Sequence, residues 1–209
     1  KKGINFPYSI YDNKTQLSVT KSFLKKSSKV LYDAIGLSFV QSETLIKKIK
    51  ILYPLKIIVS KIENQEGVNN IDNILKYSDA IMIDRGDLSA EIGIHNLFNA
   101  ILQIVKKAKN LGIPIIMATE NFDSMILKNQ PSKSEIMSAG LNSLLGVDKI
   151  MLSDETATSH NWKNTIEWLD QFLKLSKISK DNQIQFDIKS QHKIDYKKHL
   201  WNTISNIKK

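Results

Sequence analysis

The sequence predicts an α/β fold in which a parallel sheet is covered by helices on its outer faces. Short runs rich in β-branched residues are each followed by a stretch with helical periodicity, and this alternation occurs five times. The predicted strands are nearly continuous in apolar residues, which is typical of parallel strands that are buried on both faces.

Strands that follow one another at about 25 to 35 residues suit single βα units, which build either an open doubly wound sheet or a (β/α)8 barrel. A closed eight-stranded barrel usually takes about 250 residues, and this chain has 209. We therefore expect an open sheet or an incomplete barrel of about five βα units.

The individual elements follow from the pattern of apolar residues. Strands are predicted at residues 30–40, 55–62, 79–83, 113–118 and 149–152. The helices that follow them are predicted at residues 41–52, 68–77, 94–111 and 132–145, and then along the apolar face formed by Trp162, Ile166, Leu169 and Leu173. Gly112 is well placed to end the third helix, and Ser132 with Glu135 three residues later predicts the start of the fourth.

Composition excludes several classes of protein. With 42% hydrophobic and 24% charged residues the chain is ordinary for a globular protein, and it has no apolar run of about 18 residues and no secretory signal. The absence of cysteine excludes disulfides and thiolate zinc sites. We expect a cytoplasmic protein with no membrane partner.

The net charge of +9 raises the question of a nucleic-acid surface. The lysines are dispersed along the chain, however, and no stacking aromatic residues accompany them. Arg85 is the only arginine among the 30 basic residues. We interpret the charge as a solvated lysine surface and expect no nucleic-acid partner.

Polar residues gather where the predicted strands end, which is the edge at which parallel α/β folds bind ligands. Any one of these clusters has an ordinary structural explanation, as a surface ion pair, a helix cap or a turn, but four clusters on four consecutive strands favour a site. The residues are Lys61, Glu63 and Asn64; Arg85, Gly86 and Asp87; Thr119 and Glu120; and Ser153, Asp154, Glu155 and Thr156.

The residue types at this edge indicate phosphate chemistry with a metal. Glu63 and Asp87 offer hard oxygen ligands that suit Mg2+ or Mn2+. Lys61 is a compact cation able to stabilise a transferring phosphoryl group or an enolate, and Gly86 would let a ligand approach the backbone. There is no GxxxxGK[ST] or GxGxxG motif, so a role with ATP does not follow from phosphate-binding loops.

At these residues the sequence resembles the pyruvate kinase family. Residues 61–67 (KIENQEG) are similar to the family's KIEN-x-EG, and residues 81–88 (IMIDRGDL) to its strand that ends in ARGDLG. Further segments resemble its ATQ-x-x-ESM, IMLSGETA, KGVNLP and SFVR motifs, and these are residues 117–125, 150–157, 2–7 and 38–40. The order and spacing agree from residue 2 to about residue 175.

This resemblance implies a phosphoenolpyruvate-dependent (β/α)8 barrel, of which the chain carries the fourth to eighth strands. Residues 1–29 would return from a lid domain outside this chain, residues 30–176 would form the partial catalytic barrel, and residues 177–209 would be a polar extension with one candidate helix at 196–207. The first three strands are missing, and with them the family's phosphate-binding arginine and its potassium ligands.

The resemblance also implies roles for the residues at the strand ends. Lys61 would stabilise the transferring phosphoryl group and the enolate, and Glu63 and Asp87 would bind Mg2+ or Mn2+. The backbone of residues 85–87 would hold the substrate carboxylate. Thr119 would contact the substrate and, with Ser153 and Glu155, would belong to the region that delivers a proton to the enolate.

The chain departs from the family pattern at several of these places. Asp84 replaces a small residue, Glu120 an amide and Asp154 a glycine, while Gln41 stands in the place of an arginine. At about 8 Å and an effective dielectric constant near 20, each added negative charge would cost on the order of 2 kcal/mol against phosphate binding.

The function expected from the sequence is pyruvate kinase activity, in which a phosphoryl group passes from phosphoenolpyruvate to ADP and gives pyruvate and ATP. The complete enzyme would also use K+ and would form a homo-oligomer, by resemblance a tetramer. One alternative is a degenerate relative that binds a phosphometabolite or partner without phosphoryl transfer, and another is a metal-dependent pyruvate or phosphoenolpyruvate lyase. Because five βα units alone leave an open sheet edge, the isolated chain is expected to associate or to be poorly soluble.

Overall fold

The computed structural model describes residues 11–176 and residue 184. The chain divides into two compact units, of which unit 1 ends at Ile115 and unit 2 runs from Ile116 to Phe186. The candidate helix at 196–207 lies outside the described residues.

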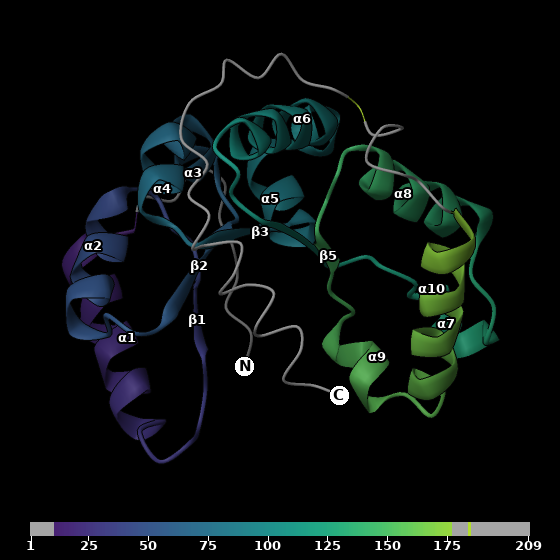
Figure 1. Ribbon diagram of the computed structural model, residues 1–209, viewed down its shortest axis with the longest axis horizontal. Coiled ribbons are helices and arrows are strands. Elements are labelled where there is room, and N and C mark those ends of the chain that lie inside the picture. The colour runs from purple at the N-terminus through teal and green to yellow at the C-terminus, as the bar shows by residue number, and fades with distance from the viewer. Residues whose placement is uncertain (1–10, 177–183, 185–209) are drawn as a thin grey trace. The chain divides into compact units, whose positions relative to one another are not determined.

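Unit 1 contains three parallel strands, one helix that precedes them and the helices that follow each strand (Figure 1). Strand β1 pairs with β2, and β2 pairs with β3. Along the chain the elements are α1 (Asn13–Lys26), β1 (Ala34–Leu37), α2 (Glu43–Leu52), β2 (Ile57–Ile62), α3 (Gln65–Asn69), α4 (Ile71–Tyr77), β3 (Ala80–Asp84), α5 (Arg85–Ile92) and α6 (Ile94–Asn110).

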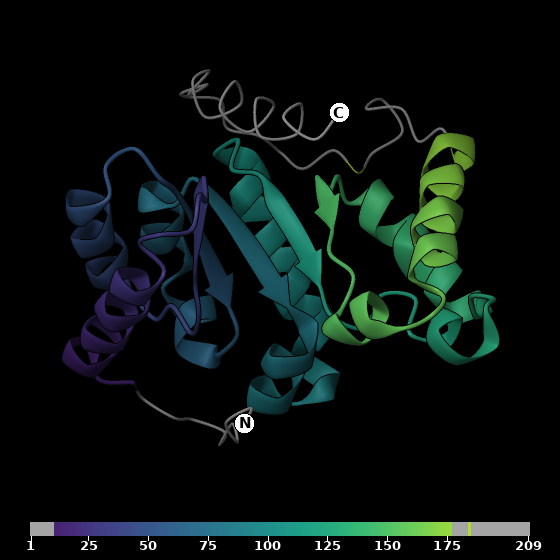
Figure 2. The ribbon, with the colours of Figure 1, turned by 90° about the horizontal axis from the view of Figure 1, so that it is seen from below.

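The helices of unit 1 cover one face of its strands, because β-branched and leucine side chains from both layers meet there. Helix α1 packs against α2, α2 against α4, and α4 against α6. Figure 2 shows β1, β2 and β3 side by side. Completely buried side chains from both layers form the core: Ile46 and Ile49 of α2, Ile58 and Ile62 of β2, Ile71, Ile74 and Leu75 of α4, and Ile81 and Ile83 of β3.

Unit 2 contains the end of β4 (Ile115–Ala118), which pairs in parallel with β5 (Lys149–Ile150). Its core joins Phe122, Met125, Ala139 and Leu169. The Trp168 ring packs between Phe122 and Phe172, with ring centroids 5.3 and 5.6 Å apart. The helices of this unit are α7 (Ser124–Lys128), α8 (Lys133–Leu144), α9 (Asp154–Thr158) and α10 (Trp162–Ser176).

The prediction of five parallel strands that alternate with helices is confirmed for the described residues. No helix among them is long and apolar enough to cross a membrane. The first strand is shorter than predicted: residues 30–33 have no regular secondary structure, with Val30 and Leu31 exposed, and residues 38–39 form a turn after β1. The helix predicted at 68–77 is two helices, α3 and α4, that meet at Asn70.

The predicted ends of two helices agree with the structure. Gly112 follows α6 with φ +65°, a conformation that glycine adopts without strain. Ser132 and Glu135 form a capping box at the start of α8. Helices α1, α5, α7 and α9 were not predicted.

Strand β1 is paired on one side only among the described residues, and an apolar cavity of about 770 Å3 lies between it and α1. Leu24, Ile35 and Leu37 are buried at this cavity, while Phe23 is 67% exposed. An open edge, as expected from the sequence, is therefore found at β1. The expected association of the isolated chain stays a prediction.

Gly67 is required by a close approach of two backbone segments in unit 1. A Cβ at this position would lie 2.7 Å from the carbonyl oxygen of Val40. We expect Gly67→Ala to lower the free energy of unfolding by about 1–3 kcal/mol, because the backbone must shift to accept the methyl group. Urea unfolding followed by circular dichroism measures this change. Gly36→Ala is the matched control, since a Cβ there meets nothing within 4 Å, and equal effects of the two substitutions would contradict the explanation.

Glu135 is the centre of a hydrogen-bond network that joins α7 and α8. It accepts from the backbone N–H of Ser124 (2.8 Å) and of Ser132 (2.7 Å), and from both serine hydroxyls. Burial raises the pKa of this carboxyl, but the hydrogen bonds from Ser124 and Ser132 outweigh burial and hold the pKa below its usual value of 4.5.

Since the pKa of Glu135 is lowered on folding, its contribution to stability is present above about pH 4.5 and is lost as the pH falls through the folded pKa. We expect Glu135→Gln to unfold more readily at pH 7 and to show a shallower loss of stability between about pH 5 and pH 3 than the wild type. Urea unfolding midpoints of both proteins, measured across this pH range, test the prediction. Glu167→Gln is the control, because Glu167 of α10 is exposed. If the stability of Glu135→Gln fell with pH as steeply as that of the wild type, the stabilising role assigned to the Glu135 carboxylate would be refuted.

Candidate active site

Lys61, Glu63 and Asp84 lie together because of strand periodicity and register. Side chains two residues apart on a strand point to the same face, so Lys61, near the end of β2, and Glu63, just after it, share a face. Ile62 pairs with Ile83 in the parallel register, and the next pair in that register is Glu63 with Asp84. The ends of two neighbouring strands therefore bring one ammonium and two carboxylates together.

The three side chains form a buried ionic cluster. Lys61 Nζ lies 2.5 Å from Glu63 Oε1 and 3.2 Å from Asp84 Oδ2. The side chains of Glu63 and Asp84 are 1% and 7% exposed, and that of Lys61 is 21% exposed. Glu63 Oε2 accepts a hydrogen bond of 2.5 Å from the backbone N–H of Phe39, so both of its oxygens are occupied.

Electrostatics at this cluster is set by burial and by the proximity of opposite charges. Burial raises the pKa of Glu63 to about 7, although Lys61 and the Phe39 amide act in the opposite direction. Burial alone would lower the pKa of Lys61, but the carboxylates of Glu63 and Asp84 outweigh it and raise that pKa. Lys61 is thus held in its charged form.

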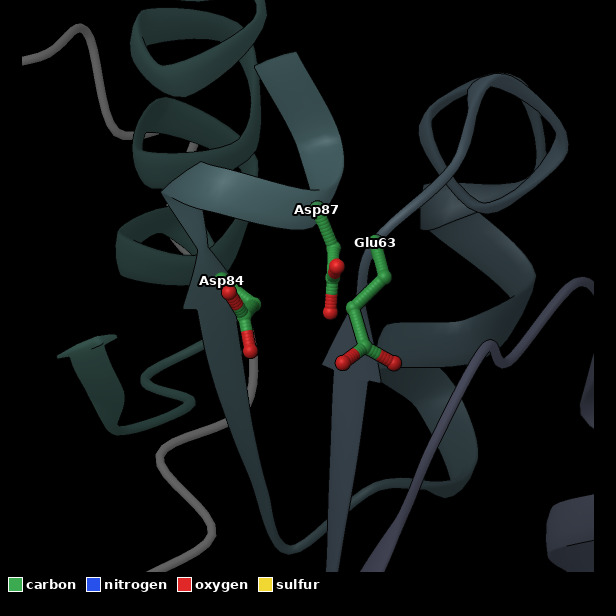
Figure 3. A group of neighbouring side chains, drawn as sticks. All are labelled: Glu63, Asp84 and Asp87. Atoms are coloured by element: carbon green, nitrogen blue, oxygen red, sulfur yellow. The ribbon is translucent and has the colours of Figure 1, made fainter. Parts of the chain in front are cut away.

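Asp87 adds a third carboxylate from the first turn of α5. One carboxylate oxygen from each of Glu63, Asp84 and Asp87 lies within 4.8 Å of the others. Figure 3 shows these carboxyl groups pointing to the same side, from the ends of two strands and the start of the helix. It is the kind of oxygen cluster that suits a hard divalent cation.

The negative charge of this region also acts on Tyr11. Burial raises the pKa of the Tyr11 phenol, and the carboxylates of Glu91, Glu63 and Asp87 raise it further. Tyr11 stacks on Phe39 with ring centroids 4.9 Å apart. The aromatic pair therefore borders the acidic cluster.

Arg85 and Gly86 begin α5 directly after Asp84. Arg85 is buried, at 9% exposure, and the carbonyl oxygen of Gly86 accepts a hydrogen bond from Ser89 Oγ (2.9 Å). Unit 1 thus holds together five of the predicted site residues: Lys61, Glu63, Arg85, Gly86 and Asp87.

Thr119, Ser153 and Glu155 belong to unit 2. Thr119 follows β4, while Ser153 caps α9 and accepts from the backbone N–H of Thr156 (3.3 Å). Glu155, in the first turn of α9, is exposed. Asn121 links the two strand ends, because its Nδ2 donates to the carbonyl oxygens of Met117 (3.2 Å) and Met151 (2.8 Å).

The backbone after β4 is strained. Thr119, Glu120 and Phe122 have φ values of 62°, 50° and 62°. The left-handed region is unfavourable for residues with a side chain, and most of all for a β-branched one. Such strain is typical of functional segments whose surroundings enforce the conformation, and Thr119 is the first residue of this strained segment.

Comparison with known proteins gives the family. A family model described as "Pyruvate kinase, barrel domain" matches residues 1–166. The chain is 36% identical over 169 residues to a pyruvate kinase of Encephalitozoon cuniculi, covering 80% of this chain and 40% of that protein. It is 34% identical over 210 residues to a pyruvate kinase of Clostridium acetobutylicum, covering 98% of this chain and 44% of that protein.

The chain belongs to the pyruvate kinase family. The resemblance inferred from the motifs is confirmed, and the five parallel strands are those of a partial barrel of this family. The chain spans about two fifths of the length of these two relatives.

The structure shows the contacts of two residues at which the chain departs from the pyruvate kinase pattern. Asp84 has joined the ionic cluster at Lys61. Gln41, in the expected place of an arginine, is buried; its Oε1 accepts from the backbone N–H of Tyr11 (3.1 Å) and its carbonyl oxygen accepts from Asn70 Nδ2 (2.9 Å).

Two groups of the ionic cluster were not predicted from the sequence, the Asp84 carboxylate and the Phe39 backbone N–H. Asp84 was noted as a substitution but not as a member of the carboxylate cluster, although the two-residue periodicity and the expected pairing of adjacent strands would have placed it there. The Phe39 amide was missed because a backbone donor carries no signature in residue type. Its only signal was the SFV segment at residues 38–40.

Proposed function

We propose that this chain is the portion of a pyruvate kinase that binds phosphoenolpyruvate and a divalent cation, in an enzyme that transfers the phosphoryl group to ADP and yields pyruvate and ATP. Family membership supports the reaction class. The observation that carries the proposal is the charged Lys61 held at the strand ends beside Glu63, with Asp87 in the same cluster. A cation fixed next to hard oxygen ligands is what phosphoryl transfer requires.

Glu63 and Asp87 would hold Mg2+ or Mn2+. The donor set fits, because these ions usually take one or two carboxylates and complete their shells with water and substrate oxygens. When bound there, the ion would supply positive charge that neutralises a phosphate group. The family resemblance adds K+ for a complete enzyme, with ligands outside this chain.

Other residues of the chain would bind the substrate, stabilise its charge and deliver a proton. The Lys61 ammonium would stabilise charge on the transferring phosphoryl group and on the enolate left behind. The backbone of Arg85, Gly86 and Asp87 would bind the substrate carboxylate, since Gly86 permits close approach. Thr119 would contact the substrate and, with Ser153 and Glu155, would serve the delivery of a proton to the enolate.

The proposal also covers the ligands of the enzyme, its location, its oligomeric state and its division into segments. Phosphoenolpyruvate, pyruvate, ADP and ATP would be its small-molecule partners. A cytoplasmic homo-oligomer, tetrameric by family resemblance, would be its assembled form. The division into a segment returning from a lid (1–29), a partial barrel (30–176) and a C-terminal extension (177–209) belongs to the same proposal.

A second candidate function is a degenerate relative that binds a phosphometabolite without transferring phosphate. One observation favours it: Lys61 is paired with Asp84 as well as with Glu63. A second carboxylate on the ammonium reduces the positive charge that Lys61 offers to a phosphoryl group.

Replacing Lys61 tests the phosphoryl-transfer proposal directly. We expect Lys61→Ala, in a full-length protein that contains this segment, to reduce ATP formation by about 10³-fold or more, because the group that stabilises transition-state charge is lost. Pyruvate release gives the rate, and circular dichroism checks the fold. Lys174→Ala is the control, since Lys174 is an exposed lysine paired with Asp170. Undiminished turnover in Lys61→Ala would remove Lys61 from the mechanism.

Calorimetry separates the two candidate functions. Mn2+ and then phosphoenolpyruvate are titrated into the same full-length protein, and ADP is added to measure turnover. We expect both ligands to bind and ATP to form. Binding of both without turnover would support the degenerate relative, and failure of phosphoenolpyruvate to bind would contradict the pyruvate kinase proposal.

A further inference from the structure

Asp84 has a buried carboxylate oxygen that nothing in the described part of the chain satisfies. The residue ends β3 and is 5% exposed. Its Oδ2 pairs with Lys61 Nζ at 3.2 Å, whereas Oδ1 has no hydrogen-bond partner among the described residues. A buried carboxylate oxygen without a partner is costly, so this atom indicates a ligand that the described residues do not supply.

The unsatisfied oxygen belongs to a side chain that points into the carboxylate cluster (Figure 3). One oxygen from each of Asp84, Glu63 and Asp87 lies within 4.8 Å of the others. Opposite ligands of a six-coordinate ion bound at about 2.1 Å are about 4.2 Å apart. Small side-chain adjustments are thus enough for one ion to contact all three residues.

We propose that Asp84 is a third carboxylate ligand of the divalent cation held by Glu63 and Asp87. This inference rests on the metal site of the proposed function and adds to it a residue for which the family pattern has a small side chain. In the absence of the ion, the Lys61 ammonium is the cation that holds Asp84 and Glu63 together.

Charge counting shows the consequence of a third carboxylate. Two carboxylates, the Lys61 ammonium and a divalent ion leave one formal positive charge for an anionic substrate. With Asp84 the sum is zero. The chain therefore binds the cation with its own ligands and depends less on substrate oxygens to complete the coordination shell.

The competing explanation is that Asp84 serves only as a counter-ion of Lys61. Both explanations account for the 3.2 Å ion pair, but they differ for the metal. A ligand contributes to cation affinity, so its removal weakens binding. A pure counter-ion makes no bond to the ion, so its removal costs much less cation affinity, through the loss of its longer-range attraction alone.

Mn2+ titration without substrate distinguishes these explanations. Free Mn2+ is measured by electron paramagnetic resonance with the full chain, its Asp84→Asn and Asp84→Ala variants, and Asp170→Asn as the control. Asn keeps the shape of Asp84, and Ala is the small residue type that the family pattern places there. We expect the Mn2+ Kd to rise at least tenfold in both Asp84 variants and to stay unchanged in Asp170→Asn, which removes an exposed carboxylate of α10.

The outcomes separate this inference from the proposed function. If the wild type binds Mn2+ and both folded Asp84 variants bind it equally well, Asp84 is not a ligand, and the Glu63 and Asp87 site remains. If the wild type and all variants fail to bind Mn2+, the metal site of the proposed function is lost together with this inference. Circular dichroism identifies any variant that fails to fold, and the other Asp84 variant then decides the question.

Discussion

The arrangement of the site depends on one ammonium group, that of Lys61, which lies between the buried carboxylates of Glu63 and Asp84. Buried charges are tolerated only when they are paired, and removal of one partner of a buried pair typically costs about 3–5 kcal/mol. The cluster therefore fixes the side chains at the ends of β2 and β3 relative to each other. Because Asp84 leads directly into α5, the same pairing fixes the backbone from which Arg85, Gly86 and Asp87 extend.

Much of the fold follows from the sequence because the strands of unit 1 are almost wholly apolar. The run at residues 57–62 and the run at residues 80–84 are recognisable as buried strands without further information, and the capping residues Ser132 and Glu135 mark the start of α8. The short helices α5 and α7 were missed because they carry no apolar stripe of sufficient length. Helix α1 was missed because its face toward β1 is only partly buried.

The site was predictable to the extent that it follows from strand periodicity and residue type. Lys61, Glu63 and Asp87 were identified as charged groups at strand ends, and the structure places them together. The hydrogen bond from the Phe39 amide and the left-handed backbone at Thr119 were beyond prediction. Both features depend on the path of the backbone, which is imposed by packing of the surrounding chain. Neither requires a particular side chain at its own position.

Two departures from the family pattern act in the same direction on the electrostatics of unit 1. Gln41 has an amide where the family pattern has a cationic side chain, and its Oε1 accepts from the backbone N–H of Tyr11. Asp84 adds an anion beside Lys61. Lys61, the cation of the cluster, is already paired with Glu63 and Asp84. A phosphorylated ligand that binds here has to gain much of its favourable electrostatic energy from a bound divalent cation. Anion binding in this chain should therefore depend on metal more strongly than in relatives that keep an arginine and a small residue at these two positions.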